Sequence, residues 1–353
     1  MKKTVLVLFG GCSSEHEISR LSAATMLRNL SREKYEPVTV GITKSGRWFL
    51  TSATPEEIEN GQWENCRGNR TAFLSPDRSV RGLVVMEQEE TRVLPVDVVL
   101  PALHGKNGED GTVQGLLQLS GLPFVGCAAR ASAVCMDKAV THTLLTAARV
   151  KQANYLWLYA VNYETGAEKV KTRVRERLGY PVFVKPANAG SSVGVSKVTR
   201  EEDLDAAMAK AAHEDDKILI EEAIEGQEVE CAVLGNDKPE AAPMVGEIAA
   251  SAEFYDYDDK YISGTSQLYL PAHLDPEVAE EIRRTACRAY RMLGCQGLAR
   301  VDFFVRGGKE VILNEINTMP GFTAISMYPK LWESCGVSCT ALLDRLIGLA
   351  LER

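Results

Sequence analysis

The sequence lacks the cysteine and histidine patterns that are typical of disulfide frameworks and zinc sites. It has five histidines, and its nine cysteines include no Cys-x-x-Cys pair. An odd number of scattered cysteines is typical of a protein with reduced thiols. We therefore exclude a disulfide scaffold and a zinc site.

Long hydrophobic runs and an excess of basic charge are also missing. The apolar run near the N-terminus is short and ends at Gly10-Gly11, and the low-charge stretch 115–136 is interrupted by glycine, proline and arginine. We expect a buried first strand rather than a signal peptide, no membrane partner, and a cytoplasmic protein. Lys and Arg number 40 against 48 Asp and Glu, a formal net charge of −8, which argues against a nucleic-acid partner.

Two nucleotide-binding motifs are absent as well. The sequence has no Gly-x-x-x-x-Gly-Lys-Ser/Thr loop, and no Gly-x-Gly-x-x-Gly follows a strand-like run. A P-loop NTPase and a dinucleotide-binding dehydrogenase are therefore poor interpretations.

The length of 353 residues predicts two to three domains. Up to residue 135, strand-like runs at 4–9, 38–43 and 96–100 accompany a helical pattern after Ser13, which is typical of an α/β domain with a largely parallel sheet. Residues 53–95 look irregular by comparison. The sequence therefore predicts an N-terminal α/β unit over 1–135.

Two further units are expected, over 136–225 and 226–353. In the second, Asp137 should cap a helix, and Thr199 should open another through a capping box with Glu202. Its strands are expected at 182–185, 193–198 and 217–222. In the third, helices should begin at Pro276 and after Ser338, each with an apolar stripe.

The segment 298–317 predicts a β-hairpin, because two strand-like runs flank Gly307-Gly308. A two-residue turn there would set Arg300 opposite Glu315, and strand alternation would place both on one face with Asp302 and Asn317. Two carboxylates and an amide oxygen are ligands that Mg²⁺ takes beside phosphate oxygens, and an arginine would stabilise a transferred phosphoryl group. The alternative is a solvated face with one surface ion pair.

A loop of small residues, 186–194, follows a strand that ends in Lys185. Glycine and serine let backbone amides approach an anion, and the lysine supplies a positive charge. These features favour a phosphate-binding loop, although a plain hairpin connection fits the same residues.

Other candidates for binding a nucleotide are lysines and glutamates. Lys260 lies in a tyrosine-rich segment, 254–261, that could cover a site and exclude water, and Lys138 starts the second unit. Glu221 and Glu228 could accept hydrogen bonds from an adenine amino group and ribose hydroxyls. The alternative is that these lysines and glutamates are solvated surface residues.

Two loops are expected at the carboxyl edge of the first sheet. The loop 10–19 follows the first strand and carries Glu15 at the start of a helix, and the loop 104–111 contains His104. Open α/β sheets bind ligands at this edge, so both loops could line one crevice.

Seven motifs, in this order and over nearly the whole chain, resemble those of the D-alanine-D-alanine ligases of the ATP-grasp superfamily. The motifs are Gly10-Gly11 to Ser19, His104-Gly105 to Gly111, Met136-Asp137-Lys138, Lys185-Pro186 to Gly194, Tyr255 to Tyr261, Arg300-Val301-Asp302 and Asn314 to Gly321. Each is modest by itself, whereas seven in the order of the family are specific.

The resemblance implies an α/β protein with a three-domain ATP-grasp fold, in which a parallel-sheet domain precedes two α+β domains that sandwich ATP. It implies an ATP-dependent ligase that joins two D-alanine molecules through an acyl phosphate, for peptidoglycan synthesis. Two Mg²⁺ or Mn²⁺ ions would bridge the phosphates. A homodimer is the habit of the family, and a covering loop would span about residues 251–270.

The resemblance also implies roles for single residues. It assigns catalysis to Glu15, Ser191, Tyr261 and Arg300, ATP binding to Lys138, Lys185, Glu221, Glu228 and Lys260, substrate binding to His104, Gly321, Ser326 and Met327, and metal binding to Asp302, Glu315 and Asn317. Glu15 would meet the ammonium group of the first D-alanine, and Ser191 and Tyr261 would link to Glu15 and fasten the covering loop.

Some residues depart from the family pattern. Ala189 replaces a frequent acidic residue, and Ile325 stands where a histidine is common. Parts of the sequence also resemble the resistance-type ligases that join D-alanine to D-serine. Because Met327 should favour a methyl group over a hydroxyl, and Tyr261 argues against D-lactate, we expect D-alanine as the second substrate, with D-serine as the alternative.

Overall fold

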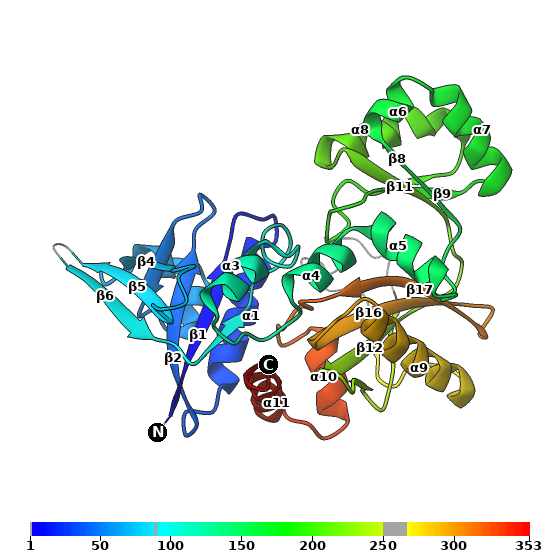
Figure 1. The fold of residues 1–353 in the computed structure, drawn as a ribbon. Coiled ribbons are helices and arrows are strands. Elements are labelled where there is room, and N and C mark those ends of the chain that lie inside the picture. Colours follow the sequence, from blue (N-terminus) through cyan, green and yellow to red (C-terminus); the bar gives the residue numbers. More distant parts are fainter. Residues whose placement is uncertain (1, 88–89, 250–266) are drawn as a thin grey trace.

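The computed structural model describes residues 2–87, 90–249 and 267–353, and this part of the chain forms three β-sheets with helices packed against them (Figure 1). The predicted α/β fold is confirmed. Sheet topology and helix positions explain how residues far apart in the sequence reach one site.

The first sheet has the strand order β6-β5-β4-β3-β2-β1-β7. Strand β1 pairs in parallel with β2 and β7, and the outer strands are antiparallel. Residues 5–9 of β1 are fully buried, as expected for a central parallel strand covered on both faces. The elements of this part are β1 Lys3–Gly10, α1 His16–Asn29, β2 Tyr35–Ile42, β3 Trp48–Thr51, α2 Pro55–Glu59, the 3₁₀ helix Gln62–Asn65, β4 Arg70–Leu74, β5 Gly82–Glu87, β6 Glu90–Pro95, β7 Val98–Pro101, α3 Thr112–Ser120 and α4 Ala129–Met136.

The second sheet has the order β10-β9-β11-β8. Helices α6, α7 and α8 lie on one side of it, and α5 lies between this sheet and β17 of the third sheet (Figure 1). The predicted cap of α5 is confirmed, since Asp137 Oδ1 accepts a hydrogen bond from Val140 N at 3.0 Å. The elements are α5 Lys138–Ala147, β8 Tyr155–Tyr159, α6 Ala160–Glu164, α7 Ala167–Arg177, β9 Val182–Pro186, β10 Ser196–Val198, the 3₁₀ helix Glu201–Asp203, α8 Leu204–Glu214 and β11 Lys217–Glu222.

The third sheet has the order β15-β14-β12-β16-β17, and β13 pairs with β12. The predicted apolar stripe of α9 is confirmed, because Val278, Ile282, Ala286 and Ala289 are buried. The elements are β12 Gln227–Gly235, β13 Glu240–Ala241, β14 Gly246–Ala249, β15 Gln267–Tyr269, α9 Pro276–Met292, β16 Gly297–Arg306, β17 Glu310–Asn317, α10 Met327–Ser334 and α11 Cys339–Leu351.

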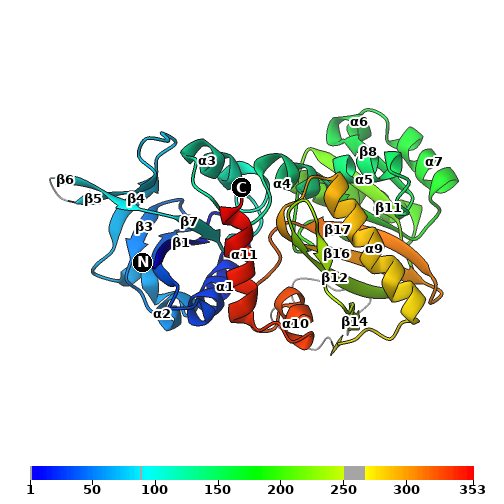
Figure 2. The same ribbon diagram turned by 60° about the horizontal axis from the view of Figure 1, so that its bottom comes forward.

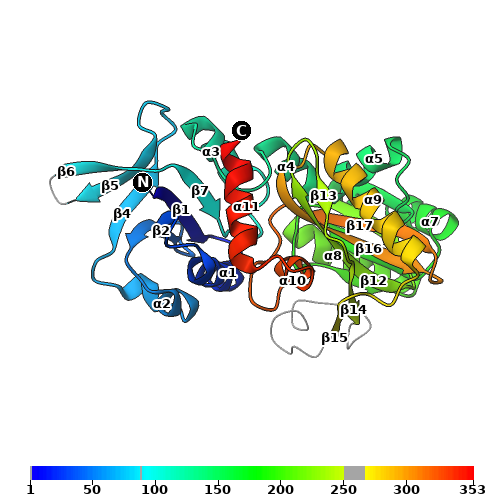
Figure 3. The same cartoon turned by 90° about the horizontal axis from the view of Figure 1, so that it is seen from below.

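Helix α11, near the C-terminus, packs against the N-terminal part of the chain. It lies between the first sheet and the third sheet in two further views (Figures 2 and 3). Its buried Leu346 and Ile347 share one hydrophobic core with Val98 and Leu100 of β7 and with Leu234 of β12. The N-terminal and C-terminal parts of the protein therefore share a core through this helix.

Three predictions of local structure are wrong. Residues 53–95 are not irregular, because they include β4, β5 and β6; strand β6 is exposed at nearly every position and so shows no apolar alternation. Thr199 forms no capping box, since a 3₁₀ turn without a side-chain cap precedes α8. Strand β10 starts at Ser196 rather than at residue 193, because Ser191, Ser192 and Gly194 adopt positive φ angles in the preceding loop.

One finding concerns membrane spans. Within residues 2–87, 90–249 and 267–353, no single helix has the length and apolar composition to cross a membrane, although α10 and α11, bent by 107°, reach them as a pair.

Candidate active site

The hairpin of β16 and β17 sets its polar side chains in a register that differs from the predicted one. Arg300 pairs with Asn317 and Asp302 with Glu315, so the predicted pairing of Arg300 with Glu315 is wrong. The turn contains three residues instead of two, and an irregularity after Asp302 adds one more. Because two one-residue shifts leave the face unchanged, the four side chains still share one face, as predicted.

Arg300 lies between two carboxylates. Its Nε and Nη2 donate to Asp302 Oδ1 and Oδ2 at 2.8 and 2.7 Å, and its Nε lies 3.0 Å from Glu230 Oε2. Burial alone would lower the pKa of the Arg300 guanidinium, but Asp302 and Glu230 hold it well above its usual range. Glu230 was not predicted from the sequence. It reaches the site because β12 pairs it with Asp302 of β16.

The three predicted metal ligands form a donor set that suits Mg²⁺. Asp302 and Glu315 pair across the hairpin, and Asn317 Nδ2 donates to Asp302 Oδ2 at 2.9 Å. The amide oxygen of Asn317 and the two carboxylates are hard oxygen ligands, and magnesium sites of this kind take their remaining ligands from phosphates and water. Within residues 2–87, 90–249 and 267–353, no group of three or more histidine, cysteine, aspartate or glutamate side chains has metal-site geometry.

Two adjoining cavities collect the predicted residues. The larger, of about 410 Å³, is lined by Glu15, His104, Lys138, Ser191, Arg300, Glu315, Asn317, Gly321, Ser326 and Met327. The smaller, of about 140 Å³, is lined by Lys185, Glu221, Glu228 and Asp302 together with Lys138, Ser191 and Glu315. Lys260 and Tyr261 lie outside the described residues. All the other predicted site residues therefore line one of two neighbouring cavities.

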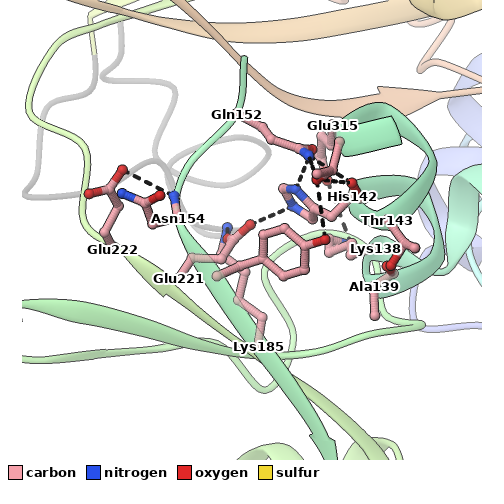
Figure 4. Close-up of polar contacts among 12 residues, drawn as sticks. Lys138, Ala139, His142, Thr143, Gln152, Asn154, Lys185, Glu221, Glu222 and Glu315 are labelled. Carbon is pink, nitrogen blue, oxygen red and sulfur yellow. Dashed lines mark hydrogen bonds and ion pairs between the residues drawn. The ribbon is translucent and has the colours of Figure 1, made fainter. Parts of the chain in front are cut away.

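Two lysines of the smaller cavity, Lys138 and Lys185, lie beside glutamates (Figure 4). Lys185 Nζ lies 2.5 Å from Glu221 Oε2. Lys138, at the first turn of α5, donates to the backbone oxygen of Ala189 at 2.7 Å and lies 3.6 Å from Glu315 Oε2. Lys138 thus connects the small-residue loop to the hairpin.

Glu15 lies at the start of α1 and is buried. Ser191 Oγ donates a hydrogen bond to Glu15 Oε1. The positive end of the helix dipole and free amides at this helix start favour a carboxylate there. This contact ties the small-residue loop between β9 and β10 to the start of α1.

His104 joins the first sheet to the segment after β17. Its Nδ1 donates to Met319 O at 3.1 Å, so its Nε2 accepts from Ser22 Oγ at 2.9 Å; Ser22 Oγ in turn accepts from Phe322 N at 3.2 Å. Burial lowers the pKa of His104 despite the nearby Glu15. A neutral His104 with its proton on Nδ1 satisfies every contact, and Ser22 is a further residue that sequence reasoning missed.

The residues of the predicted second amino-acid subsite lie together after β17. Ser326 Oγ accepts from Thr323 N at 3.0 Å, and a Cβ on Gly321 would lie 2.9 Å from this oxygen. Met327 is buried, and its sulfur would lie 2.4 Å from a Cβ on Gly246. Ile325, by contrast, is largely exposed at the cavity.

A second acid in the larger cavity, Glu109, was not assigned from the sequence, although it lies in the predicted loop 104–111. Its Oε1 accepts from Gly105 N at 3.1 Å. Burial, followed by repulsion from Glu15, raises the pKa of Glu109 to about 8. Glu109 is therefore largely protonated at neutral pH.

Glu109→Gln should stabilise the ligand-free protein more at pH 8.5 than at pH 5. An unfolded glutamate titrates near pH 4.3, so the native state holds an extra proton between about pH 4.3 and 8 and loses stability as pH rises through this window. Glutamine has no such dependence. Thermal denaturation of both proteins at the two pH values measures the difference, with Glu36→Gln at an exposed position as the control. An equal change in melting temperature at both pH values would contradict the shift.

Comparisons with known proteins agree with this geometry. The family model "D-ala D-ala ligase N-terminus" matches residues 4–127, and "D-ala D-ala ligase C-terminus" matches residues 144–348. The D-alanine-D-alanine ligase of Caldicellulosiruptor bescii is 48% identical, over 100% of this chain and 96% of the relative.

Two solved structures have the same fold. The VanG D-Ala:D-Ser ligase of Enterococcus faecalis has a TM-score of 0.90 and 40% identity, covering 99% of this chain and 100% of the other. The D-alanine-D-alanine ligase of Coxiella burnetii has a TM-score of 0.86 and 36% identity, covering 100% of this chain and 96% of the other. On its matched models, full-length relatives and fold, the chain belongs to the D-alanine-D-alanine ligase family.

Proposed function

We propose that this protein uses ATP to join two D-alanine molecules into D-alanyl-D-alanine, releasing ADP and phosphate. The observation that carries the proposal is the 410 Å³ cavity, which is lined by Glu15 at the start of α1 and by Arg300, Glu315 and Asn317 of the hairpin. A carboxylate that could bind an ammonium group and an arginine that could contact a phosphoryl group therefore line the same cavity. Family membership supports the same reaction.

The proposed reaction has two steps, and Glu15 and Arg300 have different roles in it. The carboxylate oxygen of the first D-alanine attacks the γ-phosphorus of ATP, the bond to ADP breaks, and an acyl phosphate forms. The amine of the second D-alanine then attacks the acyl carbon, loses a proton, and expels phosphate. Glu15 binds the first ammonium group, and Arg300 stabilises the charge that develops on the phosphoryl and acyl oxygens.

The nucleotide is proposed to occupy the smaller cavity. Lys138 and Lys185 would bind its phosphates, while Glu221 and Glu228 would accept hydrogen bonds from the base and ribose. Asp302, Glu315 and Asn317 would hold two Mg²⁺ or Mn²⁺ ions, which would neutralise phosphate charge.

Other assignments stay predictions. Ser191, with Tyr261, would fasten a covering loop over the site, and Lys260 would add a charge to the nucleotide. We also propose a role in peptidoglycan synthesis in the cytoplasm, a homodimer, and domain boundaries near residues 135 and 225.

The second amino acid is the least constrained part of the proposal. The similarity to a D-Ala:D-Ser ligase keeps D-serine as the alternative. His104, Gly321, Ser326 and Met327 would shape the subsites, and the buried thioether of Met327 favours a methyl side chain over a hydroxyl group.

Product analysis tests the function. Purified protein with ATP and Mg²⁺ should release phosphate in the presence of D-alanine and form D-alanyl-D-alanine, identified by mass, even when D-serine is present at equal concentration. Omitting ATP is the control. D-alanyl-D-serine as the main product would establish the alternative, and the absence of any dipeptide would contradict the proposal.

A further inference from the structure

A buried histidine beside the nucleotide cavity has contacts that the reaction above does not use. His142 lies on α5 one turn after Lys138, and its side chain is 2% exposed. Its Nε2 lies 2.6 Å from Glu221 Oε1, and its Nδ1 lies 2.6 Å from Gln152 Oε1 (Figure 4). Both ring nitrogens thus face oxygen atoms at hydrogen-bonding distance.

The amide of Gln152 has one possible orientation, in which its Oε1 accepts a hydrogen bond from His142 Nδ1. Its Nε2 donates to His142 O at 2.7 Å and to Thr146 Oγ1 at 2.6 Å. Thr146 Oγ1 gives its own proton to His142 O. Turning the amide over would place two acceptors, Gln152 Oε1 and His142 O, against each other. Nδ1 of His142 therefore carries a proton.

The other partner is an ionised carboxylate. Burial alone would raise the pKa of Glu221, but Lys185 and His142 hold it far below its usual range. An ionised carboxylate accepts hydrogen bonds and donates none, so Nε2 of His142 carries a proton as well. His142 is therefore an imidazolium with both of its protons used.

The charged and aromatic groups near His142 lie on α5, β8, β9, β11 and β17. Lys185 on β9 binds the second oxygen of Glu221, and Lys138 on α5 approaches Glu315 on β17. The ring of Tyr155 on β8 packs against the imidazole at 4.8 Å between centroids. His142, Lys185 and Glu221 together carry one positive charge, whereas Lys185 and Glu221 alone would be neutral.

We infer that His142 is a positioning residue for the nucleotide. Its imidazolium shares the Glu221 carboxylate with Lys185, fixes that carboxylate between two cations, and leaves the trio with a net positive charge for a polyphosphate. This role rests on the proposed binding of ATP by Lys185 and Glu221. It acts through Coulomb attraction in a poorly solvated cavity, where one charge has a large effect.

Substitution separates charge from shape. His142→Gln retains a donor for Glu221 and removes the charge, so the KM for ATP should rise about tenfold while kcat stays within twofold, because uniform binding of the nucleotide is lost. His142→Lys restores a cation with three donors and should return KM to within threefold of the original. If the role of His142 were only structural, His142→Lys would have a KM for ATP no lower than that of His142→Gln. His213→Gln, at a side chain that is 85% exposed, is the matched control and should change neither constant.

Nitrogen-15 NMR of the unmutated protein tests the charge without ATP or turnover. Both ring nitrogens of His142 should show directly bonded protons, one facing Glu221 and one facing Gln152. A ring nitrogen of His142 without a proton would overturn the inference, and so would an unchanged KM in folded His142→Gln. If His142→Gln does not fold, the spectrum and His142→Lys decide. Failure of the unmutated protein to bind ATP, with His142 doubly protonated, would instead contradict the proposed function.

Discussion

Arg300→Lys is expected to lower kcat for dipeptide formation by about 10²–10³-fold with little change in the KM for ATP. The guanidinium presents several donors in a plane, and charge develops on several oxygens during phosphoryl and acyl transfer. Lysine keeps one positive charge beside Asp302 and Glu230, so these buried carboxylates remain partnered. Loss of directed donors from a preorganised site typically costs this much.

Steady-state rates of phosphate and dipeptide release measure the effect. Arg283→Lys on α9 is the matched control, because Arg283 contacts Glu280 and the backbone of Ala242 rather than the cavity. Melting temperatures of the two variants show whether the fold is intact. A folded Arg300→Lys enzyme with kcat within threefold of the original would contradict the role of Arg300.

The second large effect is expected for Glu15→Gln. The KM for the D-alanine that provides the carboxyl group should rise about 100-fold, because an amide cannot offset the charge of a buried ammonium group. Glutamine retains an oxygen that accepts the hydrogen bond from Ser191. The small-residue loop should therefore stay attached, and the loss should concern the substrate alone.

Initial rates over a wide range of D-alanine concentrations measure this change. Glu17→Gln is the control, since Glu17 lies on the same helix but pairs with Lys44 at the surface. If saturation by D-alanine is the same in Glu15→Gln as in the original protein, the ammonium is bound elsewhere.

Residue type and spacing were sufficient to predict the hairpin and the shared face of its polar residues. The predicted pairing of Arg300 with Glu315 was wrong, because the local sequence does not distinguish a two-residue turn from a three-residue turn and does not indicate the bulge. The shared face was still predicted correctly, because the two one-residue shifts add up to two residues and so keep each side chain on the same face. Which face of a strand a side chain occupies is therefore easier to predict than its partner on the next strand, because a shift of two residues changes the partner and leaves the face unchanged.

Other site residues could not be found from the sequence because tertiary structure alone brings them together. Glu230 reaches Arg300 through the pairing of β12 with β16, and Ser22 reaches His104 across 82 positions of sequence. In the sequence His142 looks like an ordinary polar residue of a helix, and only the fold brings Glu221 of β11 next to it. The irregular look of 53–95 has a related cause, since the exposed strand β6 gains its order from pairing with β5.

The placement of α11 has a consequence for synthesis on the ribosome. Strand β7 ends at residue 101, and α11 begins at residue 339, so the surface of the first sheet that α11 covers emerges about 240 residues before its cover. At roughly 5–20 residues per second, Val98 and Leu100 have waited on the order of 10–50 s before Leu346 and Ile347 exist to pack on them. During this interval the core of the first sheet lacks the side chains of α11 that complete it.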